Sequence, residues 1–401
     1  MKTILLLGGS AQQIIAIETA KRIGLRTVLC DYLPDNPGQY HADMFYQVST
    51  TDKEAILQVA NDENIDFILA YASDPAAPTA AYVAEKLGLP TNPYRAVEIL
   101  CNKDLFRQFL KSHHFNTPCA CGFFSKEDAL SNIGRFSFPI IIKPVDSSGS
   151  KGATVLKTTE KLEEAIDFAF SFSRGHRIII EEFVEKKHPF LIGGDIFVSG
   201  GKIVQWGLMN CHRDDHVNPL VPVGKSYPLC LSDEELREVK YTLQKLVTEL
   251  DIKFGPMNVE LVVDKHNRVY PIDIGPRSGG NMIPDLLGMI FDCDLVEMTV
   301  RSAMGETIST THFEERGFYA THNLHSDRNG MFDHVEYSME IRQYIIKENV
   351  YKQNGDPVNI FTNAAYAIGI VFMKFPDNEI MLRILNKINE HIHVVLKEEL
   401  K

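Results

Sequence analysis

The first ninety residues alternate between short apolar runs and amphipathic stretches. Residues 3–9, 26–32 and 65–73 are apolar runs with the length of buried strands, and the first ends in two glycines. Residues 11–24 and 53–64 carry apolar side chains at helical spacing. Buried strands joined by helices form parallel β-α-β units. The pattern therefore predicts a parallel sheet with helices on both faces.

The middle of the chain mixes helices with strands and hairpins. Pro90 and Pro93 mark the change of pattern, and we place a domain boundary there. Ser232 followed three residues later by Glu235 is a capping box, which predicts the start of a helix. We expect helices at 96–112 and 232–250, strands at 139–144, 154–157 and 177–185, and hairpins at 195–206 and 257–277.

Composition narrows the class of protein. A chain of 401 residues is long enough for two to four domains. A net charge of −12 argues against a general binder of nucleic acids or anionic membranes. The seven cysteines form no CxxC pair, which is typical of free thiols in a reducing cytoplasm. The apolar run at residues 4–7 is too short for a signal peptide, and no segment has the length of a membrane span.

An acidic hairpin is the first chemical signal. If Asp264 pairs with Val269 around a four-residue loop, then Glu260 faces Asp273 on the same side of the sheet. Two facing carboxylates repel each other unless a cation lies between them, and Mg²⁺ shared with nucleotide phosphates matches this arrangement. The alternative is a solvated face with two unrelated acids. A slip of one residue would put the two acids on opposite faces.

A lysine and a flexible loop form the second signal. Lys143 ends an apolar strand, where a charge does not serve packing. Gly149 and Gly152 allow the following loop to bring backbone N–H groups close to phosphate oxygens, and Lys151 adds a charge. The spacing of a Walker P-loop is absent. By itself this stretch is more typical of a flexible surface turn.

Two further segments add weaker signals. The strand that ends near Glu181 offers backbone groups from Glu182 to Val184 that suit the edge of a purine. Arg277 follows Asp273 by four residues, and its guanidinium could clamp a carboxylate or a transferring phosphoryl group. Each of these signals has an ordinary structural alternative, namely a strand that ends in acids and a surface arginine.

Along the chain the signals follow the order Lys103, Lys143, the glycine-rich loop, the strand end near Glu181, the facing acids and Arg277. In that order they resemble the ATP-grasp superfamily of carboxylate–amine ligases, which includes biotin carboxylase, carbamoyl phosphate synthetase and glycinamide synthetase. The resemblance covers roughly residues 1–305. It implies an α/β chain with a Rossmann-like parallel βα domain at 1–92. An ATP-grasp domain of two α+β subdomains would follow at 93–305, with a C-terminal α+β region at 306–401.

The resemblance also implies roles for individual residues. Lys103 and Lys143 would hold the ATP phosphates, Glu260 and Asp273 would bind Mg²⁺ or Mn²⁺, and Arg277 would act with Lys143 at the reacting carboxyl phosphate. The mobile loop over the phosphates would be Ser147, Ser148, Gly149, Ser150, Lys151 and Gly152. The adenine-binding hinge would be Glu181, Glu182, Phe183 and Val184, with His188 in the place of a ribose-binding glutamate.

The chain departs from the family pattern at the metal site. The second acid is usually glutamate and is Asp273 here, and the asparagine that often binds a second metal ion is replaced by Gly275. Asn281 could substitute for that asparagine. The second metal site therefore lacks one of the ligands that the family pattern implies.

The implied reaction is ADP-forming ligation in the cytoplasm. ATP would activate a small carboxylate as an acyl phosphate, and an amino acid or small amine would attack it. We expect small-molecule substrates and, from the family, a homodimer. In this family the N-terminal domain would contribute to the acceptor site, with Ala72, Ser73 and Asp74 near the strand ends.

Other interpretations stay open at this point. A regulatory ATP-binding protein of the same fold would fit Gly275. A nicotinamide oxidoreductase is suggested by the N-terminal glycines and Asp31, but Ser10 and Gln13 stand where the dinucleotide motif needs glycine. His212 and His216 have a metal-ligand spacing only if helical, and the surrounding polar residues favour a loop, where Arg213 could contact the substrate.

Overall fold

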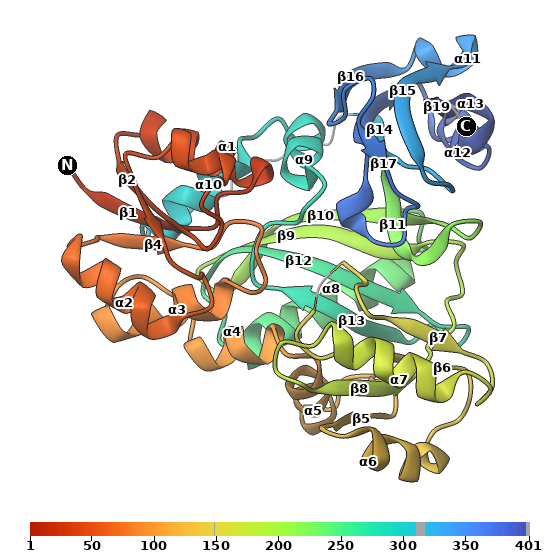
Figure 1. Ribbon diagram of the computed structural model, residues 1–401, viewed down its shortest axis with the longest axis horizontal. Coiled ribbons are helices and arrows are strands. Elements are labelled where there is room, and N and C mark those ends of the chain that lie inside the picture. The colour runs from red at the N-terminus through yellow and green to blue at the C-terminus, as the bar shows by residue number, and fades with distance from the viewer. Residues whose placement is uncertain (148, 310–316, 398–401) are drawn as a thin grey trace.

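The N-terminal domain is a parallel four-stranded sheet flanked by helices. The computed structural model describes residues 1–147, 149–309 and 317–397 (Figure 1). The sheet order is β3-β2-β1-β4 and every pairing is parallel. The strands are β1 (Thr3–Leu7), β2 (Arg26–Asp31), β3 (Met44–Gln47) and β4 (Phe67–Leu69). The helices are η1 (Ala11–Gln13), α1 (Ile14–Arg22), η2 (Pro37–Tyr40), α2 (Lys53–Asp62) and α3 (Ala77–Leu87).

Two details differ from the sequence prediction. Strand β3 was not predicted, because it is half-exposed at the sheet edge and lacks a continuous apolar run. The helix expected at 96–112 is two helices, α4 (Tyr94–Leu100) and α5 (Lys103–Ser112). The break occurs at Asn102, whose side chain accepts hydrogen bonds from the N–H groups of Asp104 and Leu105 and so begins a new helix.

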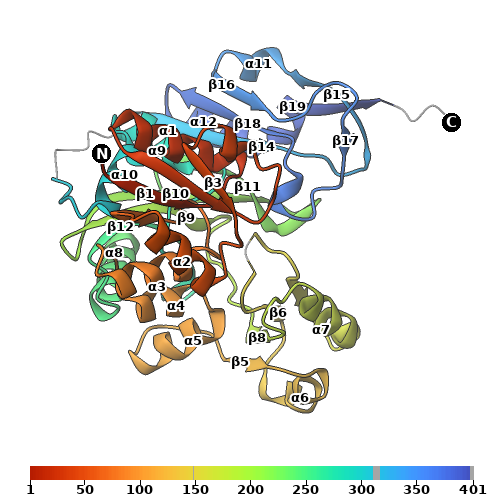
Figure 2. The same cartoon turned by 60° about the vertical axis from the view of Figure 1, so that its left-hand side comes forward.

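A smaller antiparallel sheet follows, in the order β5-β8-β6-β7. Figure 2 shows this unit standing apart from the rest of the molecule, with α7 over one face. The apolar side chains of β6 and β8 pack against α7, which explains the isoleucine runs in both strands. The strands are β5 (Ala120–Phe123), β6 (Ile140–Pro144), β7 (Thr154–Leu156) and β8 (Ile178–Glu182). The helices are α6 (Lys126–Ser131), η3 (Ile133–Arg135) and α7 (Leu162–Ser171).

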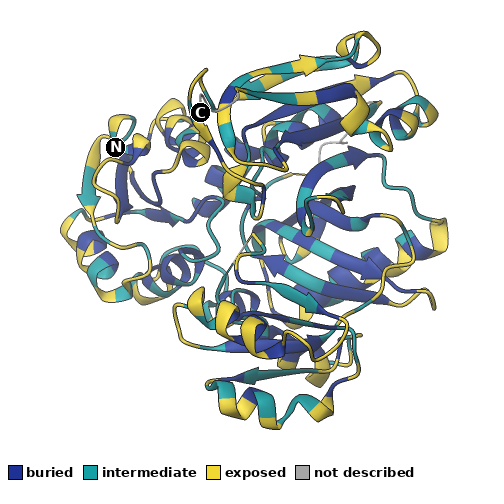
Figure 3. Cartoon of the chain, turned by 45° about the vertical axis from the view of Figure 1, so that its right-hand side comes forward, coloured by how far each residue is buried: buried dark blue, intermediate teal, exposed yellow. Residues whose placement is uncertain are grey.

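The largest sheet has eight strands in the order β13-β12-β9-β10-β11-β14-β18-β16. It continues into the C-terminal region beyond residue 305, because β14 pairs with β11, β18 with β14 and β16 with β18. Its buried face is the dark layer in the middle of Figure 3. The strands are β9 (Leu191–Ser199), β10 (Lys202–Asp214), β11 (Asn218–Tyr227), β12 (Phe254–Val263), β13 (Val269–Gly275), β14 (Phe318–Leu324), β16 (Ile345–Val350) and β18 (Gly369–Phe375).

Helices cover this sheet and complete the chain. The capping box at Ser232 and Glu235 is confirmed: the Ser232 side chain accepts from the Glu235 N–H, and the Glu235 carboxylate accepts from the Ser232 N–H. A third antiparallel sheet, β17-β15-β19, lies in the C-terminal region. The remaining elements are α8 (Asp233–Glu249), α9 (Ile283–Phe291), α10 (Leu295–Ala303), β15 (Gly330–Tyr337), α11 (Met339–Arg342), β17 (Pro357–Val358), η4 (Ala364–Tyr366), α12 (Asn378–Leu385), α13 (Ile388–His391) and β19 (Ile392–Lys397).

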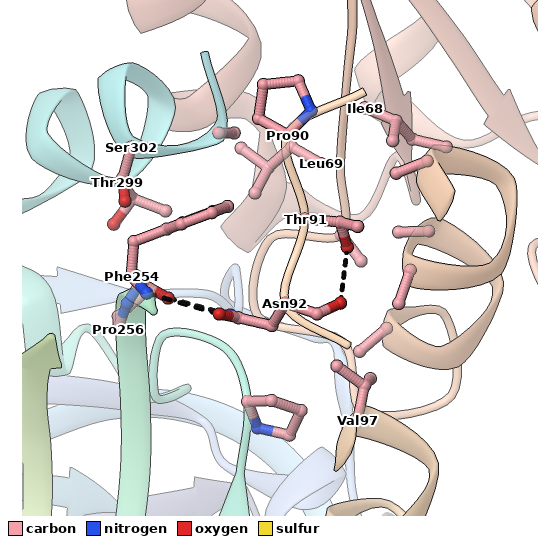
Figure 4. A pocket seen from close by; sticks show the side chains of 18 residues that line it. Ile68, Leu69, Pro90, Thr91, Asn92, Val97, Phe254, Pro256, Thr299 and Ser302 are labelled. Atoms are coloured by element: carbon pink, nitrogen blue, oxygen red, sulfur yellow. Dashed lines mark hydrogen bonds between the residues drawn. The ribbon is translucent and has the colours of Figure 1, made fainter. Parts of the chain in front are cut away.

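The N-terminal domain is tied to the large sheet through Asn92. Its side-chain amide donates to the Phe254 carbonyl at 2.8 Å, and its oxygen accepts from the Lys253 N–H at 2.8 Å. A cavity of about 90 Å³ lies beside this contact (Figure 4). Its lining includes no titratable side chain among the described residues. Within the same described ranges, no helix has the length and apolar character needed to cross a bilayer.

Candidate active site

A larger cavity, of about 420 Å³, opens between the small sheet and the eight-stranded sheet. Its lining combines lysines, acids and apolar side chains from β6, β7, β12 and β13. Among the sequence-predicted site residues, those that line it are Lys103, Lys143, Ser147, Gly149, Ser150, Lys151, Glu181, Glu182, Phe183, Val184, Glu260 and Asp273. The structure therefore brings segments more than 150 residues apart to one cavity.

The two predicted metal-binding acids face each other through a β-bulge. Val263, not Asp264, pairs with Val269, so the register assumed from the sequence is wrong by one residue. If the observed pairing of Val263 with Val269 continued without a bulge, Asp273 would lie on the opposite face of the sheet from Glu260. A register shift next to Glu260 adds one residue to β13, and Glu260 then pairs directly with Asp273. The predicted pair thus depends on a β-bulge, which the hydrophobic pattern does not predict.

Arg107 supports the bulged strand. Its guanidinium donates to the Ile272 carbonyl at 2.7 Å and to the Pro271 carbonyl at 3.3 Å. Pro271 has no N–H to donate to a neighbouring strand, and proline within a sheet is found at such irregular positions. The helix α5 therefore holds the strand that carries Asp273.

Arg107 also belongs to a buried ionic network with Glu181 and Lys143. The Glu181 carboxylate lies 2.9 Å from Arg107 Nε and 2.9 Å from Lys143 Nζ. Burial raises the pKa of Glu181, but Arg107 and Lys143 outweigh it and lower that pKa to about 2. Burial lowers the pKa of Lys143, and Glu181 opposes that change. Both oxygens of Glu181 lie within ion-pair distance of a cation, although Oε1 accepts no hydrogen bond, so we propose that Glu181 orients Lys143 rather than contacting a nucleotide.

Replacing Glu181 with glutamine should destabilise the fold in a pH-dependent way. The variant leaves two buried cations facing a neutral group, which should cost roughly 3 kcal/mol of unfolding free energy at pH 7. The pKa of Glu181 is lower in the folded state, so its contribution is present above about pH 4.5 and is lost as pH falls toward 2. Urea unfolding at pH 7 and at pH 3.5 checks this, because the difference between wild type and variant should shrink at the lower pH.

The matched control is Glu163→Gln. Glu163 forms an exposed ion pair with Lys126, and such pairs contribute about 0–1 kcal/mol. An equal loss of stability in both variants, or a difference that stays constant with pH, would contradict the assignment for Glu181.

The acid pair is suited to a divalent cation. Glu260 accepts from Arg213 at 2.6 Å, whereas Asp273 has no ion-pair partner among the described residues. No group of three or more His, Cys, Asp or Glu side chains within those residues is arranged to hold a metal ion. Two carboxylates that open into a cavity fit Mg²⁺, which is usually held by one or two carboxylates together with phosphate oxygens.

The glycine-rich loop contacts Lys103. Lys103 Nζ donates to the Ser147 carbonyl at 2.5 Å, and the Ser150 hydroxyl donates to the Leu220 carbonyl at 2.8 Å. Gly149 and Ser150 both have positive φ, of 67° and 61°, which shows the unusual backbone that the sequence suggested. Ser148 lies outside the described residues.

The predicted adenine hinge is only partly available. The Glu182 N–H donates to the Cys119 carbonyl, and the Phe183 N–H donates to the Pro139 carbonyl. Within the described chain, only the Val184 N–H of these three donates to no other residue. Among the three N–H groups, only that of Val184 is therefore free to donate to a purine, beside the apolar lining of Ile141, Leu191 and Val262, while the carbonyl groups of the predicted hinge stay part of the prediction.

Three predicted site residues do not line the cavity: Gly152, His188 and Arg277. Gly152 is buried, and a side chain there would collide with Pro144 and Phe172 at 2.8 Å. His188 Nε2 lies 3.0 Å from the Glu235 carboxylate, at the start of α8. Arg277 binds Asp74 of the N-terminal domain. Asn281, the expected substitute metal ligand, is also absent from the described lining.

The competing motifs have structural explanations. Asp31 accepts from the Gly9 N–H at 2.7 Å and from the Leu33 N–H at 2.9 Å. The Asn36 side chain packs against Gly9, where an added Cβ atom would lie 2.0 Å from Asn36 Oδ1. His212 lies in β10 and not in a loop, and its Nε2 lies 2.8 Å from the Ser226 hydroxyl. Burial lowers the pKa of His212 to about 4, so this imidazole is neutral.

Sequence reasoning assigned no catalytic-site role to Arg107 and only a tentative substrate contact to Arg213. Both have buried guanidinium groups that bind the acids of the site. Arg107 could have been found from its spacing, because it follows Lys103 by four residues and lies between the apolar Phe106 and Phe109 of one helix. Arg213 left no comparable signal in the sequence.

Comparisons with known proteins agree with this geometry. The family described as "Carbamoyl-phosphate synthase L chain, ATP binding domain" matches residues 102–311. "Formate-dependent phosphoribosylglycinamide formyltransferase" of Methanocaldococcus jannaschii is 27% identical over 320 residues, which cover 77% of this chain and 78% of that protein. "Uncharacterized protein y4rH" of Sinorhizobium fredii is 23% identical over 299 residues, or 72% of this chain and only 60% of that protein.

The fold of the whole chain is similar to a solved structure. The L-amino acid ligase from Bacillus licheniformis superposes with a TM-score of 0.82, covering 99% of both chains at 18% sequence identity. The similarity extends through the C-terminal region, which lies beyond the matched family segment.

Proposed function

The chain belongs to the family of the ATP-binding domain of the carbamoyl-phosphate synthase L chain, and from this premise we propose that it is an ADP-forming ATP-grasp ligase. The enzyme would activate a small carboxylate as an acyl phosphate and join it to an amine. One observation carries the proposal: a single cavity holds Lys103 and Lys143 together with the facing carboxylates of Glu260 and Asp273. Cations for phosphates and acids for a metal ion are what phosphoryl transfer requires.

The first step would be attack of a carboxylate oxygen on the γ-phosphorus of ATP. The bond to the bridging oxygen breaks, ADP leaves, and an acyl phosphate forms. Lys103 and Lys143 would bind the phosphate oxygens and stabilise the charge that the transferring group carries. Glu181 and Arg107 would keep Lys143 in place, since the lysine is buried and its flexible stem needs a partner.

The second step would be attack of the amine nitrogen on the acyl carbon. The carbon–oxygen bond to phosphate breaks, phosphate leaves, and the amine loses a proton. The apolar lining around Ile141, Val262 and Ile272 excludes water that would otherwise hydrolyse the acyl phosphate. The glycine-rich loop at Gly149 lines the same cavity and would help to exclude water.

Glu260 and Asp273 would hold Mg²⁺ or Mn²⁺ between the protein and the phosphates. When bound, the ion supplies positive charge to the phosphate oxygens. Arg213 holds the Glu260 carboxylate at 2.6 Å and so fixes its direction before the ion arrives.

A small carboxylate and a small amine are the substrates that we favour. The similar proteins are named for formate, phosphoribosylglycinamide and L-amino acids. A cavity of about 420 Å³ must accept part of the nucleotide as well, which favours small substrates.

The proposed function predicts ADP and phosphate release that depends on a pair of substrates. The experiment incubates the purified chain with MgATP and pairs drawn from amino acids, amines and small carboxylic acids, and determines product masses. We expect ADP release with one class of pair and a product mass equal to the sum of both substrates minus water. Reactions lacking either substrate serve as controls.

Two outcomes would contradict the proposal. AMP release would mean that an adenylate forms instead of an acyl phosphate. Nucleotide binding without turnover on any pair would favour a regulatory ATP-binding protein, with Gly275 as the residue to examine first.

A further inference from the structure

Arg277 is held by an acid from another domain. Arg277 Nε donates to Asp74 Oδ1 at 2.7 Å, and Nη2 donates to Oδ2 at 2.5 Å. This two-bond geometry fixes the plane of the guanidinium group. The Arg277 side chain is only 14% exposed, so the contact is largely shielded from solvent. The two residues are 203 positions apart in the sequence, and Asp74 belongs to the N-terminal domain.

Asp74 lies where a parallel sheet offers a binding site. Strands β2 and β4 flank β1 on opposite sides, so the chain changes direction between β1 and β4. Asp74 follows the carboxyl end of β4, at this switch point. Ala72, two residues earlier, has φ of 51°, an uncommon backbone conformation for a residue with a side chain. The loop thus adopts a strained backbone close to the position of Asp74.

Gly275 provides the space for this contact. A Cβ atom at position 275 would lie 2.6 Å from Asp74 Oδ1 and 3.1 Å from Arg277 Cζ. Gly275 is not among the glycines with positive φ, so the backbone there would accept other residues. Space, and not backbone conformation, therefore requires glycine at this position. The asparagine expected from the family pattern could not fit while Asp74 binds Arg277.

Arg277 still has donors to offer. A guanidinium group has five N–H bonds, of which two bind Asp74 and one, on Nη1, binds the Ser278 carbonyl at 3.1 Å. The two others have no acceptor among the described residues. Asp74 also lines a small cavity of about 30 Å³ together with Lys103 and Asp273, directly beside the active site. Arg277 itself is absent from the lining of this small cavity, so Asp74 is the member of the pair that reaches it.

We propose that Asp74 is a positioning residue for the ligation reaction, which fixes the Arg277 guanidinium beside the active site through the space left by Gly275. The role rests on the proposed function. It makes the N-terminal domain part of the catalytic arrangement, because the orientation of Arg277 depends on an acid from that domain. It also gives Gly275 a structural role, because glycine leaves room for the Asp74–Arg277 contact.

The test compares Asp74→Asn, Gly275→Ala and a control, Gly134→Ala. Gly134 has open space around its Cβ position and no positive φ. Asp74→Asn and Gly275→Ala should each lower kcat for ADP release at least ten-fold, with the Kd for ATP and the Mg²⁺ concentration for half-maximal rate changed less than two-fold. Asp74→Glu, which restores the charge at a longer reach, should recover part of the rate. Gly134→Ala should behave as wild type.

Other outcomes overturn the proposal. Wild-type kcat in Asp74→Asn would show that Arg277 needs no partner. A large rise in the Mg²⁺ requirement of Asp74→Asn would make Asp74 a metal ligand instead. A double-mutant cycle of Asp74→Asn with Arg277→Lys in urea unfolding tests the pair without turnover, and additive effects would mean that the contact is not formed. If wild type turns over no substrate pair, the proposed function fails, and the cycle still reports whether the pair exists.

Discussion

Replacing Lys143 with methionine should lower the rate of ADP release by about 10²–10³-fold or more, the loss typical of removing one charge-stabilising donor from an active site. Lys143 is the buried cation at the end of β6, and its Nζ lies 2.9 Å from Glu181. Methionine has a similar length and no charge, so the cavity keeps its shape. The measurement is ADP release under saturating substrates, together with ATP affinity by calorimetry.

The fold should survive this substitution. Glu181 keeps Arg107 as a partner at 2.9 Å, so its charge is not left unpaired. Lys157→Met is the matched control, because Lys157 is exposed in the same part of the chain. Turnover in Lys143→Met close to that of Lys157→Met would remove Lys143 from the catalytic assignment. A collapse of the melting temperature would instead point to a structural role for the ionic network.

The elements that the sequence predicted well are those with strong local periodicity. Buried parallel strands such as β1 and β2 are predominantly apolar runs. The start of helix α8 is marked by the capping box at Ser232. Strand β3 was missed because all four of its residues are exposed or half-exposed, so it lacks an apolar run. The break between α4 and α5 depends on the Asn102 side chain, and hydrophobic periodicity does not reveal the effect of a single capping residue.

The site was harder to predict because its geometry depends on distant contacts. Glu260 and Asp273 face each other only through a bulge, and the carbonyl groups of that bulge bind Arg107 from a helix 164–165 residues earlier in the chain. The Asp74–Arg277 contact links two domains. The local sequence pattern identifies residues that are suited to catalysis or ligand binding. The tertiary fold determines which of these residues lie together in one site.

Replacing Glu260 with glutamine should reduce turnover by about 10²-fold or more, because a bound divalent cation contributes several kcal/mol to a phosphoryl transfer. Glutamine keeps an oxygen that can accept from Arg213, whose guanidinium lies 2.6 Å from Glu260, so the fold should be preserved. The amide is a weaker ligand for Mg²⁺ than a carboxylate. The concentration of Mg²⁺ that gives half-maximal turnover should therefore rise along with the loss of rate.

Metal binding separates this prediction from a general loss of activity. In the presence of an ATP analogue that is not hydrolysed, Mn²⁺ should bind wild type more tightly than Glu260→Gln, as measured by titration calorimetry. Asp273→Asn should weaken Mn²⁺ binding in the same way, because Asp273 pairs with Glu260 across the hairpin. Glu238→Gln is the control, since Glu238 is exposed on α8. Unchanged Mn²⁺ affinity in both acid variants would mean that the facing carboxylates do not hold the metal ion, and that Glu260 serves as the ion-pair partner of Arg213 instead.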